Sequence, residues 1–311
     1  MRRLGAGVAI AALLYGQIAA AQELPGFPPG VFQNTAAMGG VACSPSSLSL
    51  NFTTGSLPGG SSLTRASNGT YINISGVLST ATTNAARFNY DANYPSGNAA
   101  PSLTGPFLLY EPAATNLALQ SNAFTTTWFT GQSAVVTAAQ FTSPDGTNDG
   151  WSVTSGTGFG GILQNISFSN VAYTASVWAY SFIGTPPLVI SFGTISSGNL
   201  TTAAAIKRYA FSGTATAGSS IIQDEVNTGA GSALGLFGSQ LETGSAATSY
   251  IPTTTGSAPR AADAFTGPAI PSCAGHFTVT FDDNSTQSVT AAWPLTTTLN
   301  RPNIKSIVGA L

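Results

Sequence analysis

The chain has 311 residues, a net charge of −2, only 6% charged residues and 43% hydrophobic residues. This apolar content excludes a chain that is disordered through low hydrophobicity and high charge. The nine Lys and Arg residues are scattered, and two of them stand at the extreme N-terminus, which argues against a nucleic-acid-binding surface. The length suits one large all-β domain with small additional segments.

The N-terminal residues 1–21 have the pattern of a secretory signal peptide. Arg2 and Arg3 precede an apolar run from Leu4 to Ile18, and three alanines then form a small-residue cleavage site. The alternative is an apolar N-terminal anchor used in an assembly. The run is short for a membrane span, and no later segment reaches the necessary apolar length. Residues 22–45 are rich in Pro and Gly without a sustained period, which predicts an extended arm.

From residue 46 onward, short apolar stretches alternate with clusters of turn residues, which is typical of a β-sandwich. The first part of this region, residues 50–90, contains a predicted hairpin with strands at 70–73 and 76–80. A second part, residues 108–129, reads LLYEPAATNLALQSNAFTTTWF. Helical periodicity is absent from both parts, so the sequence predicts low helix content.

Three predicted strands follow in the middle of the chain. Ala172–Phe182 is apolar on both faces, which predicts a central position in a sheet. In Leu188–Phe192 and Lys207–Ser212, apolar residues alternate along one face, which predicts one buried side for each strand.

The last part of the region, Gly235–Asp263, reads GLFGSQLETGSAATSYIPTTTGSAPRAAD. In this order and spacing, residues 50–90, 108–129 and 235–263 together resemble a carbohydrate-binding-module-like jelly roll of bacteriophage and prophage virion-surface proteins. The resemblance implies a jelly-roll β-sandwich over residues 46–265. Two positions depart from the family: Ala114 stands where an Arg usually precedes Thr-Asn-Leu, and Phe237 stands where a Trp is frequent.

The resemblance also implies a biological setting. By this resemblance, the protein would be a tail-fibre, head-fibre or decoration protein on the virion surface. Its partners would be further copies of the chain, as a trimer, and other virion proteins, with a cell-surface glycan as ligand. The alternative is a secreted bacterial surface or extracellular binding protein of prophage origin, which agrees with the signal-peptide pattern.

Residues 266–311 are predicted as a small β appendage. His276–Phe281 forms a strand with Phe277, Val279 and Phe281 on one face, and Ser288–Trp293 returns beside it. So short a segment seldom buries enough surface to fold alone, so it should dock on the sandwich or on neighbouring subunits. Other chains are the expected cover for its apolar face, because an exposed face would invite edge pairing.

Cys43 and Cys273 lie just outside the two ends of the predicted sandwich. They form either two separate thiols or a disulfide that ties the entry of the module to its exit. The disulfide requires an oxidising compartment.

The sequence offers little for catalysis. His276 is the only histidine and begins a strand far from the motifs, and the carboxylates do not form a convergent pair. One His and two separated Cys do not make a zinc site. We therefore predict a non-enzymatic protein without a catalytic residue or a resident cofactor.

Glycan binding requires an aromatic face that stacks on a sugar ring, together with polar groups. The aromatic candidates are Trp128, Phe129, Trp151, Trp178 and Tyr180. Trp151 follows a polar turn and is the preferred exposed candidate, with burial in the core as the alternative.

Asp145 and Asp149 in that polar turn are the accompanying ligand-binding candidates. They also offer oxygen atoms to a structural calcium ion. The alternative is a pair of Asx turns, because Asp-Gly and Asn-Asp favour tight turns through the backbone.

Overall fold

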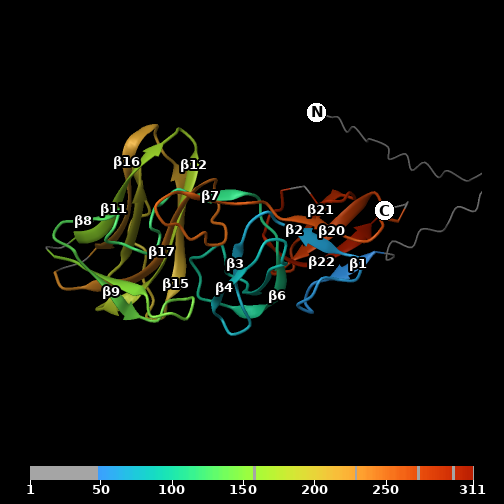
Figure 1. Ribbon diagram of the computed structural model, residues 1–311, viewed down its shortest axis with the longest axis horizontal. Coiled ribbons are helices and arrows are strands. Elements are labelled where there is room, and N and C mark those ends of the chain that lie inside the picture. Colours follow the sequence, from blue (N-terminus) through green and yellow to red (C-terminus); the bar gives the residue numbers. More distant parts are fainter. Residues whose placement is uncertain (1–47, 157–158, 228–229, 272–273, 296–297, 311) are drawn as a thin grey trace, which may run out of the picture. The chain divides into compact units, whose positions relative to one another are not determined.

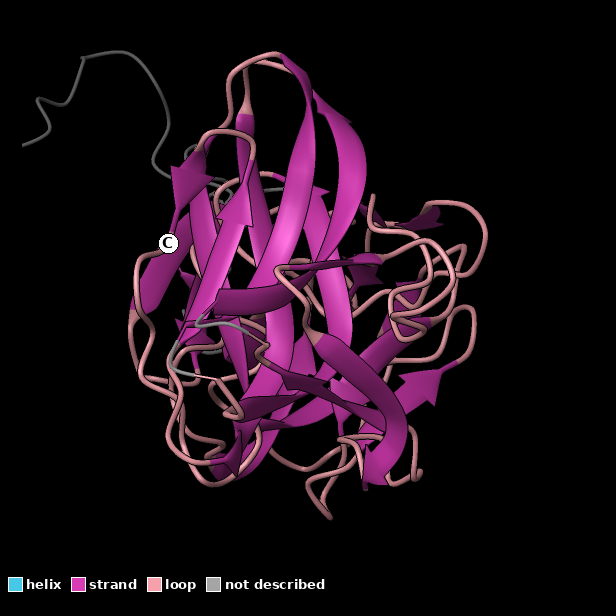
Figure 2. Cartoon of the chain, turned by 90° about the vertical axis from the view of Figure 1, so that its left-hand side faces the viewer, coloured by secondary structure: helices cyan, strands magenta, loops and turns pink. Residues whose placement is uncertain are grey.

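The computed structural model describes residues 48–156, 159–227, 230–271, 274–295 and 298–310, and all of its regular structure is β-strand (Figures 1 and 2). The predicted all-β fold class is confirmed. No helix of the described part is long and apolar enough to cross a membrane. The predicted segments 1–21 and 22–45 and the two cysteines lie outside the described residues.

Two five-stranded antiparallel sheets form a sandwich in the middle of the chain (green through yellow to orange in Figure 1). Sheet I has the order β15 (Lys207–Thr214), β12 (Ala172–Ile183), β17 (Ala233–Thr243), β10 (Gly150–Thr154), β9 (Val135–Phe141). Sheet II has the order β14 (Ile195–Ser196), β13 (Leu188–Phe192), β16 (Gly218–Asn227), β11 (Phe159–Phe168), β8 (Phe129–Gly131).

The strand orders define a jelly roll. Strands β10 to β17 fill the two sheets as β10-β17-β12-β15 and β11-β16-β13-β14, so the chain passes repeatedly from one sheet to the other. This double Greek-key order is the jelly-roll topology. The topology therefore occupies about residues 129–243, a shorter span than the 46–265 expected from the resemblance.

The core of the jelly roll explains the strand pattern. Tyr173, Val177 and Ala179 of β12 point between the sheets and are buried, as are Leu188 and Ile190 of β13. Strand β12 lies between β15 and β17, so the predicted central position of Ala172–Phe182 is confirmed. The predicted strand at Leu188–Phe192 is confirmed with the same bounds.

The remaining described strands form a flanking region, residues 48–116 and 258–310. Its main sheet, sheet III, has the order β21 (Thr286–Thr290), β20 (His276–Phe281), β22 (Asn303–Ala310), β6 (Leu103–Leu109), β5 (Phe88–Asp91), and β1 (Ser49–Asn51) also pairs with β22. Three short pairs complete it: β18 (Ala258–Arg260) with β7 (Ala114–Asn116), β19 (Ala264–Thr266) with β2 (Ser62–Thr64), and β3 (Gly69–Ile72) with β4 (Leu78–Ala81).

The C-terminal strands are part of this region's own core. Phe277, Val279 and Phe281 are almost fully buried in a cluster that also contains Phe52 and Leu108. The expectation that other chains must cover this apolar face is therefore corrected: the chain covers it itself. Residues 266–310 do not form a separate appendage, because β22 pairs with β1 and β6 from the first part of the chain.

The flanking region meets the outer face of sheet I through a third apolar cluster. Ile72, Leu78 and Tyr94 of the flanking region pack there with Trp178 of β12 and Phe237 of β17. Their contacts cover one part of the outer face of sheet I and leave the rest to solvent.

Candidate glycan-binding surface

Alternation along β12 places three aromatic side chains on the outer face of sheet I. Because Tyr173, Val177 and Ala179 point into the sandwich, Trp178, Tyr180 and Phe182 point away from it. Trp178 is only 4% exposed, because the flanking region covers it. Tyr180 and Phe182 lie beyond this cover and are half-buried.

Phe141 of β9 joins these two residues in an aromatic patch, defined as Phe141, Tyr180 and Phe182. The ring centroids of Phe141 and Tyr180 are 4.9 Å apart with an interplanar angle of 81°, and those of Tyr180 and Phe182 are 5.9 Å apart at 88°. Edge-to-face contacts of this kind stabilise an aromatic cluster beyond its buried area. Strands β12 and β9 are separated by β17 and β10, so the rings of Tyr180 and Phe141 meet over these two middle strands.

Two glycines make room for the patch. A Cβ on Gly235 of β17 would collide with the ring of Tyr180, and a Cβ on Gly150 of β10 would collide with the ring of Phe141. Gly235 pairs with Tyr180, and Gly150 pairs with Phe141, so each ring lies over the backbone of a neighbouring strand. The sheet therefore supports the rings from below and leaves their outer surfaces toward solvent.

The aromatic patch offers ring surface for stacking and one polar group, the Tyr180 hydroxyl. Burial raises the pKa of the Tyr180 hydroxyl, so that group stays a neutral donor and acceptor at ordinary pH. The hydroxyl makes no hydrogen bond within the described part of the chain, so it is available to a ligand. Aromatic faces with a nearby hydroxyl suit the apolar side and the edge of a sugar ring.

Trp151, the preferred candidate from the sequence, occupies a different environment. Its indole Nε1 donates to the carbonyl of Asn122 at 3.0 Å, and its ring contacts Phe124 at 5.8 Å between centroids. It is half-buried and packs against the core of the jelly roll. The structure therefore places Trp151 at the edge of the core and outside the aromatic patch.

The other aromatic candidates are divided between core and surface. Trp128 and Trp178 are buried, while Phe129 on β8 is 45% exposed. Phe129 belongs to sheet II and is not part of the patch.

Asp145 and Asp149 are close together but are engaged with their own turn. The hydroxyl of Ser143 lies within hydrogen-bond distance of both carboxylates, and the backbone N–H of Thr147 donates to Asp145 Oδ1 at 2.9 Å. This last bond, from a residue two positions later, is the Asx turn that the sequence offered as the alternative. Asn122 donates to the other oxygen of Asp149. Within the described residues, no group of three or more His, Cys, Asp or Glu side chains could hold a metal ion.

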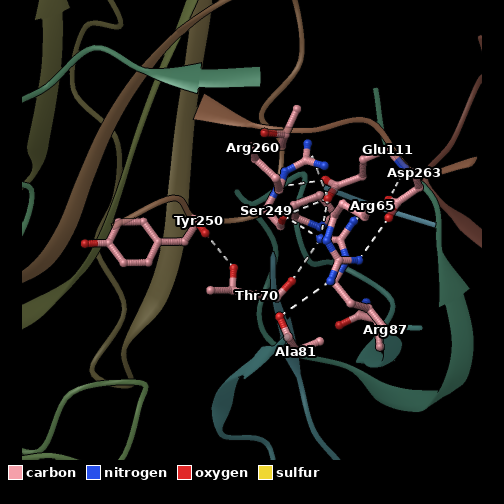
Figure 3. A network of polar contacts seen from close by, with 12 residues as sticks. Arg65, Thr70, Ala81, Arg87, Glu111, Ser249, Tyr250, Arg260 and Asp263 are labelled. Atoms are coloured by element: carbon pink, nitrogen blue, oxygen red, sulfur yellow. Dashed lines mark hydrogen bonds and ion pairs between the residues drawn. The ribbon is translucent and has the colours of Figure 1, made fainter. Parts of the chain in front are cut away.

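A buried charged cluster lies in the flanking region, where sequence analysis did not predict one (Figure 3). It consists of Arg65, Arg87 and Arg260 with Glu111 and Asp263, each at most 4% exposed. Arg87 bridges the two carboxylates: Nη1 contacts Glu111 at 2.7 Å, and Nη2 contacts Asp263. Arg65 pairs with Asp263 at 3.0 Å, and Arg260 lies 3.6 Å from Glu111.

The cluster holds Glu111 in its ionised form. Burial alone would raise the pKa of Glu111, but Arg260, Arg87 and hydrogen bonds from Ser249 outweigh it and lower the pKa to about 2. Both oxygens are occupied, since the Ser249 N–H donates to Oε1 and its hydroxyl donates to Oε2. A carboxylate held in this way cannot serve as a general acid near neutral pH.

Arg260 reaches the cluster from the strand that pairs with Ala114. Arg260 is the register partner of Ala114 in the β18–β7 pair, and its guanidinium donates to the carbonyl of Pro112 at 2.8 Å. A guanidinium therefore still reaches Glu111 from the strand opposite Ala114.

Comparisons with known proteins give distant likenesses only. No protein-family model and no curated protein matches the chain. Solved structures similar to part of it include the enzymatically active domain of tailspike protein 4 from bacteriophage CBA120 (12% identity, TM-score 0.32, 41% of this chain and 21% of that chain). Others are the CBM22-1 xylan-binding domain from Paenibacillus barcinonensis (13%, 0.34, 43% and 94%) and TmCBM61 in complex with β-1,4-galactotriose (14%, 0.32, 40% and 97%). This chain thus matches about a fifth of the tailspike chain, and these likenesses assign no ligand.

Proposed function

We propose that this chain is a non-enzymatic structural protein of a phage particle, a fibre or decoration component whose jelly roll binds glycans. The observation that carries the binding part is the aromatic patch on the uncovered part of sheet I. Phe141 and Tyr180 stand over glycines there, and together with Phe182 they present ring surface and one free hydroxyl to solvent. The resemblance of residues 50–90, 108–129 and 235–263 to virion-surface modules supports the setting.

The state of the carboxylates supports a role without catalysis. Glycoside hydrolysis requires two carboxyl groups on either side of the scissile bond, one of them protonated. Glu111 and Asp263 are buried and ion-paired with arginines, and Asp282 is paired with Arg301 at 2.7 Å. Glu111 is held ionised, and Asp263 and Asp282 are each engaged by an arginine.

A secreted bacterial binding protein is the second candidate. The pattern of residues 1–21 favours it, because a signal peptide directs export. Mass spectrometry of the native N-terminus separates the two: a mature chain that begins at Gln22 supports secretion, and an intact Met1 in purified particles supports the phage protein. Light scattering of the purified chain tests the proposed trimer.

Binding of the full-length protein to a polysaccharide panel, by affinity electrophoresis and calorimetry, tests the glycan-binding role. Tyr180→Ala and Phe182→Ala should each weaken binding at least about tenfold, equivalent to about 1.4 kcal/mol, because each removes a stacking face. Phe129→Ala is the matched control, since it removes an exposed Phe from sheet II and should leave binding unchanged. If Tyr180→Ala and Phe182→Ala bind polysaccharide as tightly as Phe129→Ala, the aromatic patch is not the glycan-binding site.

A further inference from the structure

A second candidate site lies beside the aromatic patch, where the flanking region meets sheet I, and it shares no residue with the patch. It is a pocket with a volume of about 130 Å³ between the β3–β4 hairpin, the loop after β5, and strands β12 and β15. Ile72, Trp178 and Ile206 line its apolar wall, and Asp91 and Arg208 line it with charged groups. The pocket combines an enclosed apolar wall with charges of both signs.

The volume limits what the pocket can hold. An apolar cavity of about 150 Å³ in another protein accommodates one benzene molecule. A pocket of 130 Å³ therefore has the size of one bare six-membered ring, so part of a sugar would extend through its opening to solvent, and an oligosaccharide would not fit.

Asp91 has unused hydrogen-bonding capacity although it is only 7% exposed. Its Oδ1 accepts the backbone N–H groups of Asn93 at 2.9 Å and Ser102 at 2.7 Å. Its Oδ2 accepts no hydrogen bond within the described residues. Oδ2 is not a fully buried atom, so a hydroxyl or a water in the pocket can reach it and donate to it.

Trp178 supplies the complementary donor. Its side chain is 4% exposed, and no residue of the described ranges accepts a hydrogen bond from its Nε1. Nε1 itself is not a fully buried atom, so an acceptor on a water or a ligand can reach it. Trp178 and Asp91 both line the pocket. The pocket wall therefore carries one donor, Trp178 Nε1, and one acceptor, Asp91 Oδ2, without a partner in the described residues.

Arg208 packs against the Trp178 ring and is held in place by several hydrogen bonds. Its guanidinium carbon lies 4.9 Å from the centroid of the Trp178 ring, and its nitrogens donate to the carbonyls of Pro95 and Thr248 and to the hydroxyl of Ser176. In the described part of the chain it forms no ion pair, and its charge is opposed across the pocket by that of Asp91. The two charges leave the pocket close to neutral.

We propose that this pocket binds a single neutral sugar ring. A sugar hydroxyl donates to Asp91 Oδ2, another accepts from Trp178 Nε1, and the apolar side of the ring lies against Ile72 and Ile206. A hydroxyl can both donate and accept, which matches the two free groups. A carboxylate-bearing sugar fits less well, because it would meet the Asp91 carboxylate. This assignment is independent of the aromatic patch.

The experiment is a titration of the full-length protein, with ligand-observed NMR as the readout of binding. The ligands are D-glucose, D-galactose, D-mannose, N-acetyl-D-glucosamine and D-glucuronate, each titrated separately. At least one neutral sugar should bind at millimolar concentration, and more tightly than glucuronate. Asp91→Asn should weaken that binding at least tenfold, because it replaces the free acceptor by a donor while Oδ1 still accepts the two N–H groups. Ala99→Leu should abolish binding by filling the pocket from an exposed loop position.

Phe129→Ala is the control, since Phe129 lies on sheet II, outside both the pocket and the aromatic patch, and its removal should leave monosaccharide binding unchanged. Thermal unfolding of each variant checks the fold, and Ala99→Leu keeps the test decisive if Asp91→Asn is destabilised. The proposal is overturned if no neutral sugar binds, if glucuronate binds best, or if Ala99→Leu binds like the wild type. If the wild-type protein binds a neutral monosaccharide but no polysaccharide, the proposed function is overturned and the pocket assignment stands.

Discussion

The jelly-roll core and the charged cluster of the flanking region hold their strands together by different means. The jelly-roll core is a continuous set of buried apolar side chains from the two facing sheets. The charged cluster instead joins Arg65, Arg87, Glu111 and Asp263, which are far apart in sequence, by directed ion pairs. Apolar contacts tolerate small changes in shape, whereas a guanidinium between two carboxylates requires every partner in place. The two regions should therefore respond differently to substitution.

The largest effect is expected from removing β22 by ending the chain at Pro302. This strand lies between β20 and β6 and also pairs with β1, and its Ile304 and Ile307 are fully buried. The flanking region should lose its cooperative fold, while the jelly roll keeps its own core. Limited proteolysis with mass spectrometry should show rapid cleavage within residues 48–110 and protection of residues 129–243. Wild-type protection of both segments would mean that β22 is dispensable.

Arg87→Ala tests the charged cluster directly. It leaves Glu111 and Asp263 buried without the cation that bridges them, which should cost about 3–5 kcal/mol of unfolding free energy. Urea unfolding measures the loss. Arg301→Ala is the comparison, because Arg301 is 36% exposed and pairs with one buried carboxylate, Asp282, and one exposed carboxylate, Asp283, so water can replace part of the lost contact. A loss for Arg87→Ala no larger than that of Arg301→Ala would show that the cluster contributes little.

The pH dependence of the unfolding free energy also tests the charged cluster, because the apolar jelly-roll core carries no titrating group of this kind among its described residues. The pKa of Glu111 is about 2 in the folded protein and about 4.3 in an unfolded chain. Its stabilisation is therefore complete above the unfolded pKa and is lost as the pH falls through the folded pKa. The loss attributable to Glu111 is about 3 kcal/mol.

Unfolding of the wild type and Glu111→Gln, compared between about pH 5 and pH 2, isolates this contribution because the other carboxylates are common to both proteins. The difference in stability between the two proteins should shrink as the pH is lowered. A constant difference would show that the Glu111 carboxyl titrates at an ordinary pKa when folded.

The sequence predicts the jelly-roll strands well, because alternation is a local property. Leu188–Phe192 and the central β12 follow from the identity of neighbouring residues alone. The charged cluster does not, because Arg65 and Asp263 are 198 positions apart and no local pattern links them. Likewise, only the register of sheet I shows that Phe141 approaches Tyr180. Part of the patch can nevertheless be predicted from the sequence, since alternation along the strand places Phe182 on the same face as Trp178 and Tyr180.

The smallest effect is expected from removing one methylene group from the jelly-roll core. Ile190 of β13 is fully buried, so Ile190→Val should lower the unfolding free energy by about 0.5–1.5 kcal/mol through lost burial and a small cavity. Ile74→Val in the β3–β4 turn is the matched control, because the Ile74 side chain is 71% exposed and the same change should have almost no effect. Urea unfolding of both variants gives the comparison. A loss at Ile190 far above this range would show that the jelly-roll core is as intolerant of change as the charged cluster, and the contrast between the two regions would fail.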